Sequence, residues 1–164
     1  MLEYSELMSD EVMLTRGRSV ADEIGWLIAA AQVSVDAALY RLNNPFLARV
    51  LAEAAERGLR LRLVLDRGKY EETTATREIL TEAHLAYRLS YGRLGRGSKM
   101  HHKFAILDDA TVLTGSYNWT IESEKENFDN LVILRDAAQV ELYHSEFETL
   151  WNAAEENSNS ENRK

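Results

Sequence analysis

The sequence has no cysteine among its 164 residues. This excludes disulfides, thiolate metal sites and cysteine nucleophiles, and it leaves the redox environment open. Long apolar runs are also missing, since the longest, residues 24–31, is far too short to span a bilayer. The chain starts with MLEYSELMSDE, which is acidic where a signal peptide needs a basic start. We therefore expect a soluble, cytoplasmic protein with no transmembrane segment.

Positive charge is scarce as well, because the formal net charge is −8. That value argues at first against a nucleic-acid or anionic-membrane partner. The charges are unevenly distributed, however: residues 122–164 hold eleven acids and four bases, whereas residues 85–107 hold five bases and no acid. A basic stretch of this kind is either a solvated face or part of a surface that binds phosphates.

The length and the 45% share of hydrophobic residues fit one domain with its own core. We assign this domain to residues 1–154 and expect the polar remainder, 155–164, to be a disordered tail. No internal repeat and no linker divides the chain.

Hydrophobic periodicity predicts an alternation of helices and strands. The expected strands are 33–40, 59–66, 85–91, 102–108, 111–116 and 130–135. The expected helices are one capped by Ser19, then 44–57, 74–83 and 136–154, the last with Val140, Leu142, Tyr143, Phe147, Leu150 and Trp151 on its inner side. This order predicts an α/β fold with a mixed, mostly parallel sheet flanked by helices on both faces.

The densest group of reactive side chains lies in the segment MHHKFAILDDATVLTGSYNWT. Alternate side chains of a strand share a face, so His101 and Lys103 point together while His102 points away. Ser116 and Asn118, again two apart, end the next strand, and antiparallel pairing can bring them beside the first pair. Such a group suits a phosphoryl group, because the lysine supplies charge and Ser116 and Asn118 supply neutral donors.

The spacing of this segment resembles the motif of the phospholipase D superfamily. His101-x-Lys103 is followed after four residues by Asp108, and after six more by Gly115-Ser-x-Asn. The preceding segment, 38–66, is similar to the strand, helix and strand that lead up to the motif in that superfamily. The resemblance implies the phospholipase D/nuclease fold and metal-independent cleavage of phosphodiesters through a phosphohistidine on His101. We interpret Asp108 and Gly115 as structural support.

The chain carries only one such motif, because neither His84 nor His144 is followed by a lysine two residues on. Members of the superfamily with one motif pair as dimers, so the resemblance implies a homodimer with one shared site. The acid that protonates the leaving group is then His101 of the partner subunit. In the family a glutamate often follows an asparagine by two residues after the motif. Asn127-Phe128-Asp129 has that spacing with a shorter acid, and we assign Asp129 to hold the histidine ring.

The basic stretch beside the motif predicts the substrate-binding residues Arg93, Arg96, Lys99 and Tyr117, the last as a stacking platform for a base. GRLGRGSK lacks the Gly-Lys-Ser order of a phosphate-binding loop and is followed by a strand, so we interpret it as the rim of the site. Arg67 and Lys69 extend this rim if they follow a parallel strand. We expect no metal and no cofactor, because no cysteine or HExxH spacing supports a metal site.

Three functions are compatible with these residues. The leading hypothesis is a nuclease acting on DNA or RNA, which the basic stretch favours. A phospholipase D-type hydrolase of phospholipids uses the same histidine chemistry. The third is a catalytically silent nucleic-acid-binding or scaffold domain, which the shortened acid at position 129 would permit.

Overall fold

A computed structural model describes residues 9–156. The strands are β1 (Glu11–Leu14), β2 (Ser34–Leu39), β3 (Arg60–Asp66), β4 (Arg88–Ser90), β5 (Lys103–Leu107), β6 (Thr111–Gly115), β7 (Asn130–Leu134) and β8 (Glu155–Glu156). The helices are α1 (Val20–Ala30), α2 (Pro45–Glu56), α3 (Arg67–Glu72), α4 (Thr74–Glu82), α5 (Ile121–Lys125) and α6 (Ala137–Ala153). None of these helices is long and apolar enough to cross a membrane.

One mixed sheet runs through the described part of the chain in the order β1-β7-β6-β5-β2-β3-β4-β8. Only the pairings of β2 with β3 and of β3 with β4 are parallel. The α/β class and the mixed sheet are confirmed, but the expectation that most pairings are parallel is wrong. The helical crossovers that give parallel pairs end at β4. Beyond it, β5 lies antiparallel to β2, a tight turn reverses the chain between β5 and β6, and β7 and β1 add further antiparallel pairs.

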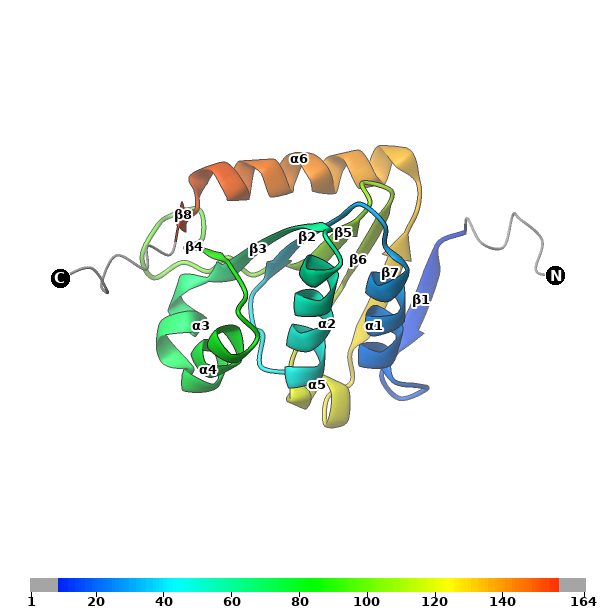
Figure 1. Cartoon of the computed structure of the whole chain (residues 1–164), viewed down its shortest axis with the longest axis horizontal. Helices are drawn as coiled ribbons and strands as arrows, with labels where there is room; N and C mark the ends of the chain where they lie inside the picture. The colour runs from blue at the N-terminus through cyan, green and yellow to red at the C-terminus, as the bar shows by residue number, and fades with distance from the viewer. Residues whose placement is uncertain (1–8, 157–164) are drawn as a thin grey trace.

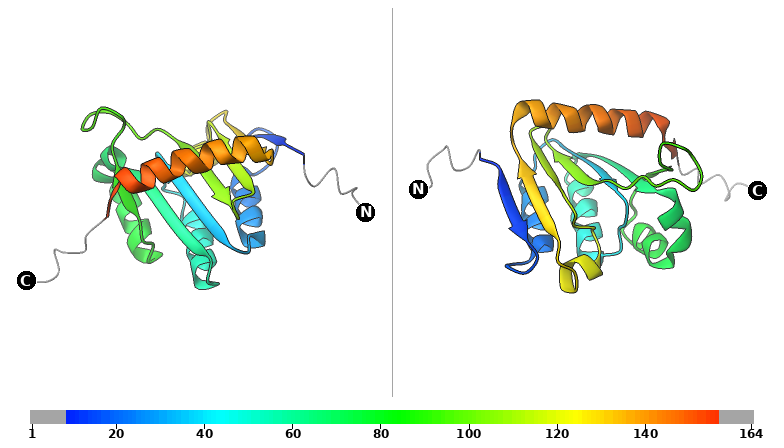
Figure 2. Two further views of the ribbon diagram at one scale, coloured as in Figure 1. Left: turned by 90° about the horizontal axis from the view of Figure 1, so that it is seen from above. Right: turned by 180° about the vertical axis from the view of Figure 1, so that it is seen from behind.

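Helices cover both faces of the sheet, as predicted. In Figure 1, α6 lies above the sheet and α1 to α4 lie below it, and the left view of Figure 2 shows α6 lying across the strands. Alternation along β2 supplies both cores: Val35, Ala37 and Leu39 belong to the lower cluster, whereas Ala38 packs with Phe147 of α6. The site is therefore built on strands that are buried on both sides.

The ends of the long helices follow local sequence chemistry. The Ser19 side chain accepts a hydrogen bond from Asp22 N at 3.0 Å and caps α1, as predicted. Asn44 accepts one from Phe46 N at 3.0 Å, with Pro45 in the first turn of α2. Beyond that helix, Gly58 takes a φ of +94°, which favours glycine.

Several details differ from the sequence-based expectation. Leu142 is 72% exposed, because the buried stripe of α6 follows Val140 and Phe147 and leaves Leu142 off it. Residues 155 and 156, assigned to the tail, form β8 against β4. The rest of the expected tail, 157–164, lies outside the described residues.

Candidate active site

The reactive residues of the motif, which exclude Asp108, lie at one end of the four strands β2, β5, β6 and β7. Neighbouring strands in this set are antiparallel, so the end of β2 and the start of β5 meet the end of β6 and the start of β7. Strands β5 and β6 pair Ala105 with Leu113. Two residues further towards this end, the same antiparallel register places Lys103 across from Gly115. The right view of Figure 2 shows these strands from behind. The strand ends thus bring the two halves of the motif together.

His101 and Lys103 lie side by side. The Lys103 ammonium donates a hydrogen bond to the backbone oxygen of His101 at 2.8 Å and lies 3.3 Å from its Nδ1. His102 points to the opposite side, where its Nε2 lies 2.9 Å from Glu146 Oε1 on α6. The two imidazoles therefore have different partners, although both residues directly precede β5 and line the same groove.

The surroundings of His101 favour its neutral form. Burial lowers the pKa of the imidazole below its ordinary value of 6.5, and the ammonium groups of Lys103 and Lys99 lower it further. Burial also lowers the pKa of Lys103, while the carboxylate of Asp129 opposes that change. A neutral imidazole beside an ammonium is suited to attack on a phosphorus atom.

Ser116 and Asp129 face one another across the segments that join β6 and β7. Ser116 Oγ donates a 2.7 Å hydrogen bond to Asp129 Oδ1 and accepts one from Asn130 N at 3.1 Å. The second oxygen, Asp129 Oδ2, is buried and has no hydrogen-bond partner among the described residues, and the same is true of Asn118 Oδ1. The site therefore contains two acceptors with free capacity.

Gly115 allows these segments to approach closely. Its φ is +129°, and a Cβ atom built on it would lie 2.4 Å from the backbone oxygen of Asn130. Any larger residue would push β6 away from β7 just before Ser116. The glycine is thus required by backbone geometry.

Asp108 lies at the other end of β5, away from His101. Its carboxylate accepts hydrogen bonds from the backbone N–H groups of Gln32, Val33 and Ser34, the shortest at 2.7 Å. Burial raises its pKa, but these hydrogen bonds outweigh burial, and the net shift is downward. Asp108 joins the start of β2 to the β5–β6 turn and does not face the reacting groups.

Beside His101, a groove of about 830 Å³ lies between the loop after β4 and the last turns of α6. Two of the predicted substrate-binding residues, Arg93 and Lys99, line it together with His101. Arg96 is exposed but is not among the lining residues, and a hydrogen bond with the side chain of Tyr91 raises its pKa. The groove thus presents loop cations next to the nucleophile.

Tyr117 is the predicted substrate-binding residue that the structure contradicts. It is 1% exposed, and its hydroxyl donates a 2.7 Å hydrogen bond to Glu124. Burial and this carboxylate raise the pKa of the phenol. Trp119, two residues on, is also 1% exposed. The prediction that Tyr117 stacks on a substrate is wrong, because the ring belongs to the core beneath the site.

The residue that the sequence analysis missed is Tyr40, which directly follows β2. Its ring centroid lies 4.4 Å from that of His101, and its backbone N–H donates to the His102 oxygen at 2.7 Å. The sequence offers one signal for it, since side chains at the ends of neighbouring strands converge. Glu146, the partner of His102, comes from α6 and has no such signal.

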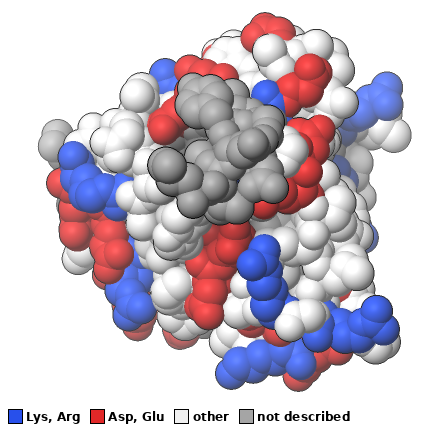
Figure 3. Space-filling view, turned by 90° about the vertical axis from the view of Figure 1, so that its right-hand side faces the viewer, with Lys and Arg blue, Asp and Glu red and all other residues white. Residues whose placement is uncertain are grey.

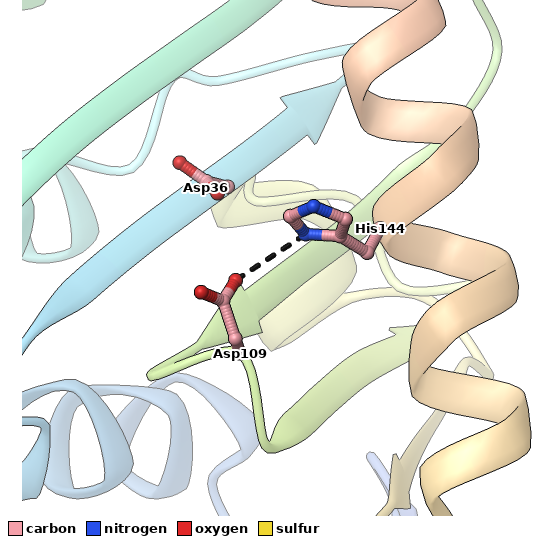
Figure 4. Close-up of side chains that lie close together, drawn as sticks. All are labelled: Asp36, Asp109 and His144. Atoms are coloured by element: carbon pink, nitrogen blue, oxygen red, sulfur yellow. Dashed lines mark ion pairs between the residues drawn. The ribbon is translucent and has the colours of Figure 1, made fainter.

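A separate cluster lies between the sheet and α6. Asp36, Asp109 and His144 hold potential metal-ligating atoms within 4.8 Å of one another, and Figure 4 shows His144 reaching from α6 towards Asp109. His144 Nδ1 lies 3.3 Å from Asp109 Oδ1 without forming a hydrogen bond. Both oxygens of Asp36 already accept hydrogen bonds from Arg60 and Arg62. Two guanidinium groups repel a cation, so we interpret the cluster as an ion-pair network.

On the face that Figure 3 shows, acidic and basic side chains are interspersed instead of forming one basic patch. The chain as a whole is acidic, but the groove beside His101 carries cations. The attraction for an anion is therefore concentrated at the site.

Comparisons with known proteins agree with this architecture. The family described as "Cardiolipin synthase, PLD-like domain" matches residues 26–151. The mitochondrial cardiolipin hydrolase of Xenopus tropicalis is 34% identical over 125 residues, which are 76% of this chain and 58% of that protein. The chain thus spans little more than half the length of this relative.

Two solved structures share the fold. Nuc from Salmonella typhimurium, a phospholipase D family member, superimposes with a TM-score of 0.80 at 23% identity, covering 90% of this chain and 97% of that one. NucT from Helicobacter pylori also gives 0.80, at 19% identity, covering 90% and 98%. At these identities the likeness shows the fold alone.

The sheet, the helices on its two faces and the His-x-Lys motif at the strand ends define a domain of the phospholipase D type. The family match covers most of the chain. The chain therefore belongs to the phospholipase D superfamily, and the resemblance seen in the sequence is confirmed.

Proposed function

We propose that this domain is a metal-independent phosphodiesterase and that its substrate is a nucleic acid. The observation that carries the proposal is the pairing of His101 with Lys103 at a groove lined by loop cations. The charge of Lys103 and the neutral donors of Ser116 and Asn118 suit the oxygens of a phosphoryl group. The membership of the superfamily supports the same chemistry.

The reaction takes two displacements. The neutral ring of His101 attacks phosphorus, a P–N bond forms, and the bond to the leaving oxygen breaks. An imidazolium gives that oxygen its proton. Water then attacks the phosphohistidine and loses a proton to this second imidazole, while the P–N bond breaks and His101 is regenerated.

We assign the second imidazole to His101 of the partner subunit, in a homodimer with one shared site. The single motif supports this, as does the buried, unpartnered Oδ2 of Asp129, which can accept a hydrogen bond from a ring N–H. Two identical histidines then take opposite protonation states, because two imidazolium ions repel one another. Dimerisation completes the acid and base pair.

The test is cleavage of labelled single-stranded DNA and RNA in EDTA by the wild type and by His101→Ala. Cleavage should persist in EDTA and fall about 10³-fold or more in the variant. His84→Asn is the matched control, because His84 has a φ of +53°, which asparagine tolerates. Loss of cleavage in EDTA, or activity retained in His101→Ala, would contradict the proposal.

Mixing the two proteins tests the shared site. If subunits exchange and each site needs two copies of His101, activity should fall as the square of the wild-type fraction. A linear fall, or a fully active monomer in sedimentation, would show that each chain works alone.

A phospholipid hydrolase is the second candidate, and one observation favours it. Leu94, in the loop beside the groove, is 91% exposed between Arg93 and an exposed glycine. A bare leucine next to cations is suited to dock on an anionic lipid surface. Leu94→Ser should then reduce cleavage of phospholipid vesicles and leave cleavage of short oligonucleotides unchanged.

A further inference from the structure

The ring of Tyr40 forms the floor beneath the nucleophile. It is 8% exposed and lies at 57° to the ring of His101, with the two centroids 4.4 Å apart. Its backbone hydrogen bond to His102 fixes it to the motif strand. The ring of Tyr40 is therefore held in a fixed position against the imidazole of His101.

Three ammonium groups surround this ring. Lys103 Nζ lies 5.1 Å from the ring centroid, Lys69 Nζ lies 5.8 Å from it, and Lys99 Nζ lies 5.9 Å from it. They come from β5, from α3 and from the loop after β4, so the fold brings them together from separate segments. The negative face of an aromatic ring attracts cations and lowers the cost of placing them close together.

The three lysines are not equally neutralised. Lys69 donates a hydrogen bond to Glu72 in the same helix. Lys99 makes no hydrogen bond or ion pair with any residue between 9 and 156. It lowers the pKa of both His101 and Glu72, which places its charge between the nucleophile and the Lys69 pair. A positive charge without a protein partner is thus held beside the site.

One phosphodiester does not account for this arrangement. It carries a single negative charge, which Lys103 balances and the neutral donors Ser116 and Asn118 complement. Glu72 partly neutralises Lys69, whereas the charge of Lys99 exceeds that requirement, so the pair of lysines has capacity for a second anion.

Resting on the phosphodiesterase function proposed above, we propose that Lys69 and Lys99, over the ring of Tyr40, bind the phosphate next to the scissile one in a nucleic acid strand. The groove supports a strand, because it continues from His101 and its loop wall carries Arg93 as well as Lys99. A backbone with a phosphate on every nucleotide places anions along such a row of cations. Glu72 competes with the second phosphate for Lys69 and limits its affinity.

The experiment compares thymidine dinucleotides that differ by one phosphate: TpT, and the same dinucleotide with an added 5′- or 3′-phosphate. The wild type should cleave one of the two phosphorylated forms about tenfold better in kcat/KM than TpT, which corresponds to about 1.4 kcal/mol of binding. Lys69→Ala and Lys99→Ala should each bring this ratio close to one. Glu72→Gln should increase it, and Arg49→Ala, on the outer face of α2, should leave it unchanged.

The outcomes separate the subsite from the function itself. If the lysine variants change the cleavage of all three dinucleotides by the same factor, the second-phosphate subsite is wrong while the phosphodiesterase stands. If the wild type cleaves none of them, nor longer DNA or RNA, the proposed function fails. Phosphatidylcholine vesicles containing cardiolipin, with two phosphates, or phosphatidylglycerol, with one, form the last arm. The ratio of cardiolipin cleavage to phosphatidylglycerol cleavage is measured in the wild type and in Lys69→Ala. If Lys69→Ala lowers this ratio but leaves the dinucleotide ratio unchanged, the substrate is a lipid with two phosphates and the nucleic-acid assignment is wrong.

Discussion

Ser116 donates a 2.7 Å hydrogen bond to Asp129, and this contact joins the segment after β6 to the segment before β7. The carboxylate also raises the pKa of Lys103 against the effect of burial. Asp129 thus fixes the hydroxyl of Ser116 and stabilises the charged form of Lys103. The shorter side chain at this position reaches Ser116 without the extra carbon of a glutamate.

Asp129→Asn should lower kcat at least about tenfold, because it removes the charge that supports Lys103 and weakens the hydrogen bond from Ser116. Steady-state hydrolysis of bis(p-nitrophenyl) phosphate measures this effect. Asp136→Asn makes the same change at an exposed helix start whose side chain makes no capping hydrogen bond, and should be neutral. Equal rates in all three proteins would exclude a role for Asp129.

The acid limb of the pH–rate profile reports the ionisation of His101. Its pKa lies below the ordinary 6.5, and the nucleophile must be neutral, so kcat/KM should rise with pH through a value below 6.5. Lys99→Ala removes one of the repelling charges and should move this limb to higher pH. NMR titration of the His101 ring in both proteins provides an independent reading. A limb that stays in place would contradict the electrostatic coupling.

Asp108→Asn tests the junction at the far end of β5. The native carboxylate accepts hydrogen bonds from three backbone N–H groups, and losing its charge should cost about 1–3 kcal/mol of unfolding free energy. Its pKa is depressed on folding, so this contribution is full above the unfolded value of 3.8 and disappears as the pH falls through the lower folded value. Urea unfolding at neutral and acidic pH should show the two proteins converging. A difference that grows on acidification would refute this account.

Gly115→Ala should destabilise the protein by more than about 1 kcal/mol, because φ is +129° and the new Cβ meets the Asn130 backbone. Activity at saturating substrate should fall too, since Ser116 follows directly. Gly17→Ala is the matched control: its nearest neighbour would lie at 3.4 Å, and its change should stay within about 0.5 kcal/mol. Thermal unfolding of both variants decides the point.

The long periodic elements could be predicted from the sequence, and the short ones could not. The helices capped by Ser19 and Asn44 lie where capping and apolar spacing placed them. α3 lacks an apolar stripe, and its start depends on Asp66, whose side chain accepts from Lys69 N at 2.8 Å. That capping residue was the available signal. β1 is a strand only because β7 lies beside it, which no local pattern reports.

The residues of the site also fall into those that local sequence predicts and those that it does not. Spacing within one strand brought His101 and Lys103 together, because strand alternation is a local rule. Tyr40 and Glu146 enter from β2 and α6 through tertiary packing, and their roles depend on which strands are neighbours. Tyr117 was misassigned for the opposite reason, since alternation alone does not tell which face of β6 is covered.

The pairing of β1 with β7 has a consequence for how the chain is made. Thr15 at the end of β1 donates to the backbone oxygens of Asn127 and Asp129, more than a hundred positions later in the chain. At about 5–20 residues per second, ribosomal synthesis leaves the first strand without its neighbour for roughly 6–25 s. Meanwhile Met13, the residue of β1 that the folded protein buries, has no sheet to pack against. Chaperone capture on nascent chains should therefore centre on β1 until residue 134 has left the ribosome. A circular permutant that begins at α1, in which β1 is made after β7 and α6, should shorten the delay.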